Sequence, residues 1–381
     1  MISEKIMENI ITNRRNLHQI PELGLEEFKT QAYLKEKLIE LGFQPMEICR
    51  TGLLVFIEGL KNETYAFRAD IDALPIEEET GLEFTSLHKG KMHACGHDGH
   101  MTILLAFAEY LSEYIKTKKL EKNVLLIFQP AEEGPGGAKL IVQEGIFDKY
   151  NVKGIFGLHL FPNIEEGVIA CKAGAMMAQT GEIDIEIKGR SGHGAMPHTS
   201  IDTILISAKL LEAYQSIISR NINPMDNAVL TFGKITGGTV RNIIAETIRL
   251  EGTARTFSRE NFDFLMDRLC QINRGFELAF DVKINEDIRP LYPAVINSKD
   301  LYNRFLKAID GMNYKEIEAL MLAEDFAFYQ ETIPGLFFFL GTRNNDMGFN
   351  KGLHNCAFNF DEKVLLKGLE VYIRLLKEYE I

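Results

Sequence analysis

The chain of 381 residues carries a formal net charge of −12, and 46% of its residues are hydrophobic. Because nucleic acids and anionic membranes attract basic surfaces, this charge argues against both as partners and leaves a small molecule or a protein. No stretch approaches about 18 consecutive apolar residues, so we expect no membrane-spanning segment. The length exceeds what one compact core usually holds and therefore predicts two domains.

The N-terminal residues and the cysteines indicate the compartment. Acidic residues come early, and no apolar run precedes a small-residue cleavage site, so we expect no secretory signal. The cysteines are widely scattered and odd in number: Cys49, Cys95, Cys171, Cys270 and Cys356. This pattern does not suggest a disulfide framework and predicts reduced thiols in the cytoplasm.

Helix-like and strand-like segments alternate in the first part of the chain. The segment 26–43 has apolar residues at helical spacing and reaches a stop signal at Gly42. The apolar segment 101–115 predicts a largely buried helix, and short apolar runs predict strands at 52–60, 64–72, 123–133 and 153–161. The alternation predicts an α/β layer with polar residues at the ends of its strands.

The middle of the chain has a different pattern. Segment 181–189 alternates apolar and polar residues, as a strand with one face in solvent should. The segments that follow predict a helix, two strands, a second helix and a strand, at 201–218, 227–235, 246–255, 258–275 and 279–287. The order β-α-β-β-α-β is that of a ferredoxin-like α+β unit. We therefore expect residues 178–290 to form a small domain inserted into the larger one.

Buried α/β character returns in the last part of the chain. Residues 335–343 predict a core strand, and residues 361–380 predict an amphipathic closing helix. The larger domain is therefore expected to be discontinuous, built from 1–177 and 291–381.

Two short runs contain residues suited to metal chemistry. Cys95 and His97 in "KMHACGHDGH" lie two residues apart, and a thiolate and an imidazole are preferred ligands of zinc and related metals. From this pair alone, the alternative to a metal site is a buried cysteine beside a hydrogen-bonded histidine, neither of which binds metal. In "FQPAEEGPGGA", Glu132 and Glu133 follow an apolar strand, where one could bind metal and the other take a proton from water. The alternative is a solvated acidic loop.

Further polar residues follow buried strands. His159 lies in "GIFGLHL" and His354 in "GLHNCAF". Polar groups at the ends of separate strands suit one cleft at the edge of an α/β sheet. Together with the two earlier runs they supply enough ligands for two metals that share a bridging water. Asp70 and Asp72, two residues apart in "RADIDALP", could hold a metal or orient a ligand histidine.

The inserted region has its own candidates in glycine-rich loops. "GRSGHGAMPH" contains His193 and His198, and "GGTVRNIIAE" contains Asn242. An imidazole and an amide can donate to a developing oxyanion, and Arg255, which ends a strand, suits a substrate carboxylate. From the residues alone, these could equally be ordinary loop residues.

Several motifs together resemble those of the M20 metallopeptidase/amidohydrolase family, in the branch with hippurate hydrolase and the indole-acetyl-amino-acid hydrolases. They run from near one end of the chain to the other, in the order "LHQIPELGLEE", "RADIDALP", "MHACGHDGH", "QPAEEGPGGA", "GLHLFP", "GHGAMPH", "GGTVRNIIAE", "AEDFAFY" and "GLHN". The resemblance implies a catalytic domain with two divalent metal ions and an inserted lid that usually dimerises, hence a homodimer. Zinc, manganese, cobalt and nickel are all compatible with a cysteine ligand.

The resemblance also implies roles for individual residues. Glu132 corresponds to the general base, and Asp70 stands where other branches of the family have a histidine ligand. His193 and Asn242 correspond to lid residues that stabilise the tetrahedral intermediate, often across a dimer interface. Arg255 corresponds to the residue that meets the substrate carboxylate, and His198 is a second substrate-binding candidate. The implied metal ligands are Cys95, His97, Glu133, His159 and His354.

A narrower similarity concerns the substrate. "RTGLLVFIEG", "ISRNINPMDNAV" and "ITGGTVRNIIAETIRLEGTAR" resemble the N-acetyldiaminopimelate deacetylases of bacterial lysine biosynthesis. This implies hydrolysis of N-acetyl-L,L-diaminopimelate to diaminopimelate and acetate. The alternatives are a broader N-acyl-amino-acid amidohydrolase, a small-peptide carboxypeptidase and a metal-binding module without catalysis.

Overall fold

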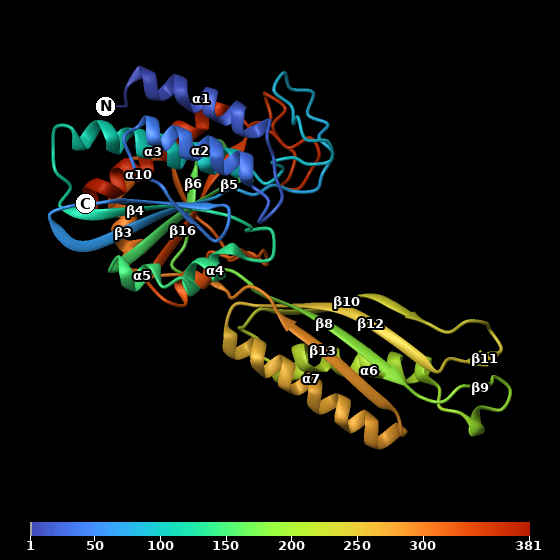
Figure 1. Cartoon of the computed structure of the whole chain (residues 1–381). Coiled ribbons are helices and arrows are strands. Elements are labelled where there is room, and N and C mark those ends of the chain that lie inside the picture. Colours follow the sequence, from blue (N-terminus) through green and yellow to red (C-terminus); the bar gives the residue numbers. More distant parts are fainter. Residues whose placement is uncertain (1) are drawn as a thin grey trace. The chain divides into compact units, whose positions relative to one another are not determined.

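The computed structural model describes residues 2–381, which divide into two compact units. Unit 1 comprises the chain up to Gly174 together with Ile296–Glu318 and Asp325–Ile381. Unit 2 comprises Ala175–Val295 and Ala319–Glu324. Figure 1 shows a large sheet with helices in unit 1 and a smaller sheet with two long helices in unit 2.

Unit 1 is built on a mixed eight-stranded sheet. The strand order is β1-β2-β4-β3-β5-β16-β6-β15. In that order the strands span Met46–Ile48, Gly52–Ile57, Lys122–Gln129, Lys61–Asp70, Val152–Glu165, Gly335–Arg343, Ile169–Cys171 and Tyr314–Glu316. The predicted α/β fold is confirmed, since this large central sheet includes the expected apolar strands.

Four central strands bring the candidate site residues to one edge. β3 runs parallel to β4 and β5, and β5 runs parallel to β16. Asp70 is the last residue of β3 and pairs with Gln129 at the end of β4. His159 on β5 pairs with Phe339 on β16. Asp70 and Gln129 thus lie at the carboxyl ends of β3 and β4, where α/β proteins bind ligands. His159, expected at the end of a strand, lies instead within β5, which continues to Glu165.

Helices cover both faces of this sheet. Figure 1 shows α1, α2, α3 and α10 on one side and α4 and α5 on the other. The helices of unit 1 are α1 Glu4–His18, α2 Phe28–Glu40, α3 His97–Ile115, α4 Gly137–Gln143, α5 Ile146–Lys149, α8 Lys299–Ala308, α9 Ala327–Gln330 and α10 Leu365–Glu378, with a short 3₁₀ turn at Glu362–Val364. None of the helices among residues 2–381 is both long and apolar enough to cross a bilayer.

Helix α3 starts earlier than its apolar pattern indicates. The expected helix begins at residue 101, whereas α3 begins at His97. Gly96 precedes it with a φ of 87°, a left-handed conformation that glycine adopts without strain. Because of this turn, Cys95 lies before the helix and His97 lies in its first turn. The turn at Gly96 thus separates the two candidate ligands.

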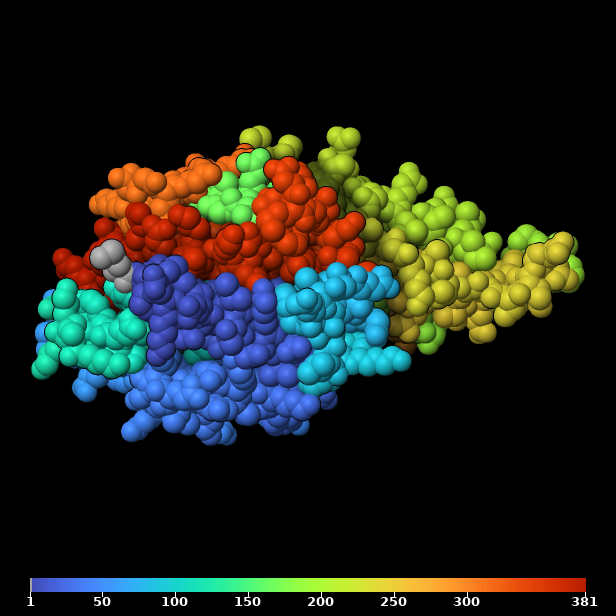
Figure 2. Space-filling model, turned by 90° about the horizontal axis from the view of Figure 1, so that it is seen from above, coloured from blue at the N-terminus to red at the C-terminus, as the bar shows by residue number. Residues whose placement is uncertain are grey.

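The irregular chain between β3 and α3 packs against the N-terminal helix. The amide of Leu87 donates to the carbonyl oxygen of Gln19 over 2.9 Å, and His18 Nε2 lies 3.1 Å from Glu78 Oε1. Figure 2 shows this light-blue segment beside the dark-blue helix α1 on the surface. The N-terminus thus helps to fix the chain that leads into the site.

Unit 2 has a four-stranded antiparallel sheet in the order β10-β12-β8-β13. The strands span Ala228–Gly237, Thr247–Thr256, Gln179–Lys188 and Lys283–Pro290, and the helices are α6 Thr203–Ser216 and α7 Arg259–Phe280. Alternate β8 residues Ile183, Ile185 and Ile187 are buried in one core with both helices. The sheet therefore has an apolar face toward α6 and α7 and a polar opposite face.

Shorter elements complete the chain. They are β7 Gly174–Met177, β9 Gly192–His193, β11 Ile243–Ile244 and β14 Val295–Asn297, a 3₁₀ turn at Pro197–Thr199 and a π-helical turn at Ile217–Asn221. β9 pairs antiparallel with β11.

Candidate metal centre and active site

The structure of unit 1 brings together the five side chains named as metal ligands. Candidate ligand atoms of Cys95, His97 and His159 lie within 4.8 Å of one another, and so do those of Cys95, Glu133 and His354. Cys95 Sγ lies 3.4 Å from His159 Nε2, and Glu133 Oε1 lies 3.1 Å from His354 Nε2. Cys95 belongs to both groups, so the two form one continuous cluster.

His97 is oriented toward the cluster by Asp72. Its Nδ1 lies 2.9 Å from the backbone oxygen of Asp72 and 3.2 Å from Asp72 Oδ1. Its Nε2 is buried and has no hydrogen-bond partner among residues 2–381. Burial lowers the pKa of His97, but Asp70 and Asp72 outweigh it and raise the pKa to about 10. A cation at Nε2 would displace this proton and satisfy the buried nitrogen.

The protonation states of His159 and Cys95 are relevant to metal binding. His159 donates from Nδ1 to the carbonyl oxygen of Leu160 over 2.7 Å, which leaves Nε2 facing Cys95. Burial holds the pKa of His159 well below its usual value, so the ring is neutral. Burial and the carboxylates of Glu133 and Glu132 hold the pKa of the Cys95 thiol well above its usual value. A divalent cation would reverse this by stabilising the thiolate. The donor set therefore fits a metal centre.

Glu132 lies beside the cluster on the turn after β4. One of its carboxylate oxygens, one of Glu133 and a ring nitrogen of His97 lie within 4.8 Å of one another. Glu132 Oε1 accepts a hydrogen bond of 3.3 Å from the backbone amide of Asp325. Glu133 is held separately, because its own amide donates to Asp72 Oδ2 over 2.9 Å. The Glu132 carboxylate and the Glu133 backbone are thus held by different partners.

Asp70 is held by hydrogen bonds on both oxygens. Arg68 Nη1 donates to Oδ2 and His100 Nδ1 donates to Oδ1, each over 2.6 Å. Burial raises the pKa of Asp70, but His97, His100 and Arg68 outweigh it and hold the pKa well below the usual value. Asp70 also lies within 4.8 Å of His97 and His100 as a possible metal group, yet its nearest contact to His97 is Nδ1 at 3.8 Å. This geometry favours an orienting role.

Sequence reasoning missed Arg68, one of the two partners that support Asp70. Arg68 is fully buried, with Nη2 2.9 Å from Asp325 Oδ1 and Nε 2.7 Å from Gln129 Oε1. His100 accepts at Nε2 from the amide of Leu160 over 2.9 Å. The available signal was an arginine inside an apolar strand next to "DID", since buried arginines are almost always paired.

His93 and Asp98 lie in the same sequence run but outside the ligand cluster. Neither ring nitrogen of His93 has a hydrogen-bond partner among residues 2–381, and burial lowers its pKa to about 3. Asp98 accepts from Arg14 Nε over 3.0 Å and lies 2.8 Å from His18 Nδ1. Asp98 therefore ties α1 to the start of α3.

In unit 2, His193 and Asn242 lie together. His193 on β9 pairs with Ile243 on β11, the residue after Asn242. The amide of Gly194 donates to the carbonyl oxygen of Asn242 over 2.9 Å. Both side chains are exposed, as is His198 in the nearby 3₁₀ turn. The loops thus present two potential donors at adjacent positions.

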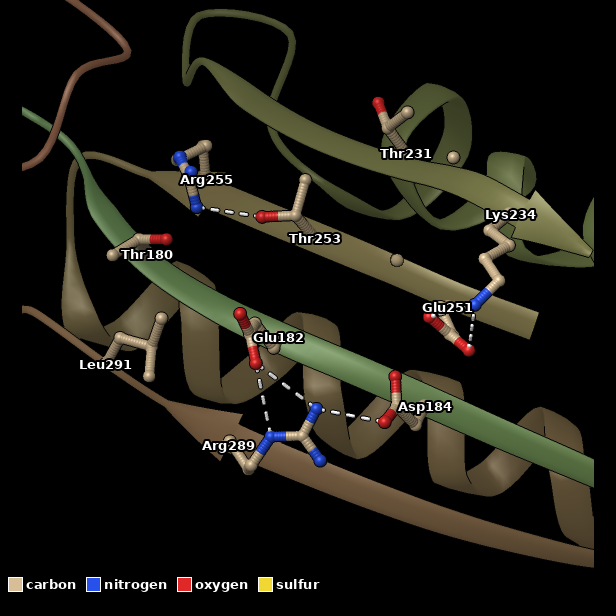
Figure 3. Close-up of a pocket in the computed structure, with 12 residues that line it drawn as sticks. Thr180, Glu182, Asp184, Thr231, Lys234, Glu251, Thr253, Arg255, Arg289 and Leu291 are labelled. Atoms are coloured by element: carbon tan, nitrogen blue, oxygen red, sulfur yellow. Dashed lines mark hydrogen bonds and ion pairs between the residues drawn. The ribbon is translucent and has the colours of Figure 1, made fainter. Parts of the chain in front are cut away.

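Arg255 lies on the polar face of the unit 2 sheet. Its Nη1 donates to Thr253 Oγ1 over 2.8 Å and to the carbonyl oxygen of Ala254 over 3.2 Å, and among residues 2–381 it forms no ion pair. The nearby Arg289 differs, because it contacts Glu182 and Asp184 at 3.2 and 3.0 Å (Figure 3). Arg255 therefore lines an open pocket with its charge available to an anion.

The α/β fold and this cluster define a metal-dependent amidohydrolase, as predicted. The chain belongs to peptidase family M20/M25/M40, whose family model matches residues 66–378. It is 40% identical to an N-acetyldiaminopimelate deacetylase of Oceanobacillus iheyensis, over 96% of this chain and 98% of that protein. It is 42% identical to an N-acetyldiaminopimelate deacetylase of Halalkalibacterium halodurans, over 94% and 95%.

Solved structures agree over the whole chain. A putative aminohydrolase from methicillin-resistant Staphylococcus aureus is 30% identical with a TM-score of 0.92, covering 98% of this chain and 97% of that one. A dinuclear metal-binding M20 peptidase from Bacillus subtilis is 31% identical with a TM-score of 0.85, covering 98% of both chains. The predicted family is confirmed.

Proposed function

We propose that this chain removes the acetyl group from N-acetyl-L,L-diaminopimelate, giving acetate and diaminopimelate in the acetylase branch of lysine biosynthesis. The full-length similarity to two deacetylases supports this substrate. The observation that carries the chemistry is the convergence of five donor side chains with one further carboxylate, Glu132, beside them.

Two divalent ions would be held by the five clustered side chains of Cys95, His97, Glu133, His159 and His354. The unpartnered Nε2 of His97 and the buried Cys95 thiol support this assignment. Zinc, manganese, cobalt and nickel are all candidates, since thiolate and imidazole ligands accept each of them. When bound, such ions lower the pKa of water and polarise an acyl oxygen.

Glu132 would act as the general base. It accepts a proton from the attacking water and returns it to the amine nitrogen as the amide C–N bond breaks, which balances the hydrolysis. The Asp325 amide holds one oxygen of this carboxylate in place. Asp72 and Asp70 would orient the histidines of the cluster, since both contact ring nitrogens there.

Unit 2 would act as a lid. His193 and Asn242 would donate hydrogen bonds to the oxyanion of the tetrahedral intermediate, Arg255 would bind the substrate carboxylate, and His198 would also contact the substrate. The uncommitted guanidinium of Arg255 supports its part. We further propose that the lid dimerises the protein and that the enzyme acts in the cytoplasm, with 1–177 and 291–381 as catalytic domain and 178–290 as lid.

The test is activity after reconstitution with each metal in turn. N-acetyl-L,L-diaminopimelate is compared with hippurate, simple N-acetyl amino acids and a dipeptide, by kcat/KM for amine release. We expect the diaminopimelate derivative to have the highest value. A higher value for hippurate or for the dipeptide would replace the proposed substrate with a broader acyl amino acid or a peptide.

A further inference from the structure

We propose that Glu27 is a positioning residue that holds the turn carrying Glu132 and Glu133 in its working geometry. This inference rests on the roles proposed above for those two carboxylates. Glu27 belongs to "LHQIPELGLEE", a motif near the N-terminus that the chemistry described so far does not use.

The turn after β4 has a backbone that needs support. Ala131 is fully buried and has a φ of 55°, a left-handed conformation that costs energy for a residue other than glycine. Its amide donates to Glu27 Oε1 over 2.8 Å, and its carbonyl oxygen accepts from the amide of Gly137 over 2.9 Å. Glu27 therefore satisfies the buried amide directly before Glu132.

The segment around Glu27 also touches the turn through its backbone. A Cβ on Gly24 would lie 2.5 Å from the carbonyl oxygen of Gly134 and 2.9 Å from Ala131 Cβ, so only glycine fits there. The carbonyl oxygen of Glu22 accepts from the amide of Ala73 over 2.8 Å. The 22–27 segment is thus packed between the turn and the residues after β3.

A role in capping α2 does not explain Glu27. Although Glu27 stands at the N-cap position of α2, its side chain makes no capping hydrogen bond. Glu22 does this instead, accepting from the amides of Lys29 and Thr30 over 2.8 and 2.9 Å. The Glu27 carboxylate is directed to the turn and to Thr51, whose hydroxyl donates to Oε2 over 2.6 Å.

Variants of Glu22 and Glu27 can therefore distinguish a structural role from a positioning role. Both are buried in one segment, but only Glu27 contacts the turn. Glu22→Ala serves as the matched control, because it leaves two helix amides without their acceptor and does not touch Ala131. Glu27→Gln serves as the conservative variant, because its amide oxygen can still accept from Ala131.

The experiment measures kcat and KM on whichever N-acyl amino acid the wild-type protein hydrolyses, and Co²⁺ affinity by equilibrium dialysis. For Glu27→Ala we expect kcat to fall about tenfold or more with little change in KM, and Co²⁺ affinity to fall several-fold, since the buried amide of Ala131 loses its acceptor and the turn shifts. Glu27→Gln should stay within about threefold of wild type in both. Glu22→Ala should lower the melting temperature and leave both within about twofold.

A loss of kcat or Co²⁺ affinity confined to Glu27→Ala supports the proposal. A Glu27→Ala protein that matches Glu22→Ala in both quantities overturns it, and so does equal impairment of the alanine and glutamine variants. If the wild type does not hydrolyse N-acetyl-L,L-diaminopimelate, the same variants are assayed on another N-acyl amino acid that it does hydrolyse. If the wild type hydrolyses none of them, the Co²⁺ comparison still decides.

Discussion

His100 donates from Nδ1 to Asp70 Oδ1 over 2.6 Å, inside a fully buried part of unit 1. The other ring nitrogen of His100 accepts from the amide of Leu160, the residue after His159. Asp70 thus connects β3 to the first turn of α3 and, through it, to β5. Its contacts indicate that it fixes the position of the histidines proposed as ligands.

The first prediction concerns this buried connection. Asp70→Asn leaves the Arg68 guanidinium without one of its two carboxylates, and breaking a buried pair typically costs about 3–5 kcal/mol. We expect the free energy of unfolding of the metal-free protein, measured in urea, to fall by about 3 kcal/mol. Asp184→Asn is the control, since its partners Arg289 and Arg249 lie at the surface. Losing a surface ion pair should lower the free energy of unfolding by about 1 kcal/mol or less. Equal losses in both variants would contradict the assignment.

The second prediction separates the two adjacent glutamates. Glu132→Gln removes the proposed proton acceptor and should lower kcat by about a hundredfold or more while the bound metal stays at the wild-type level. Glu133→Gln should instead reduce the bound metal, because it changes a proposed ligand. Metal analysis after dialysis together with kcat distinguishes them. Retained turnover in Glu132→Gln would rule out its role as base.

The third prediction concerns the lid. Asn242→Ala removes one proposed donor to the oxyanion and should lower kcat about a hundredfold without changing metal content. Asn285→Ala is the control, because among residues 2–381 the side chain of this exposed β13 asparagine hydrogen-bonds only to Glu186. If Asn242→Ala lost metal and activity in parallel, Asn242 would not be an oxyanion donor.

The fourth prediction is a pH dependence of stability. Burial raises the pKa of Glu27 from 4.5 to about 7. The folded protein therefore binds a proton on the Glu27 carboxyl more tightly than the unfolded chain does. The stability gained from this proton is fully present below pH 4.5 and is lost as the pH rises through 7. Metal-free wild type should thus lose stability relative to Glu27→Gln between pH 5 and 8, by on the order of 3 kcal/mol. Parallel urea stability curves at all pH values would show that Glu27 does not titrate in this range.

Local sequence patterns were sufficient for much of the fold. The apolar runs of β3, β4, β5 and β16 and the alternation along β8 appear as strands, because each depends mainly on which faces are buried. The start of α3 could not be read in this way. His97, Asp98 and His100 are buried polar residues, so the apolar pattern begins one turn later than the helix.

The candidate site shows a similar division. Cys95, His97 and the two glutamates stand out because metal-binding residue types occur close together in sequence. Arg68 and Asp325 do not, because their ion pair joins positions 257 residues apart. Glu27 is equally inconspicuous, since its role depends on one amide in a distant turn.

The position of His354 has a consequence for biosynthesis. It lies near the C-terminus, and its amide donates to the carbonyl oxygen of Ala94, the residue before Cys95. A ribosome therefore releases the proposed ligands of the N-terminal half long before the last one emerges. The complete set of proposed ligands can therefore form only after this final segment docks against Ala94, so full metal occupancy is expected late in synthesis.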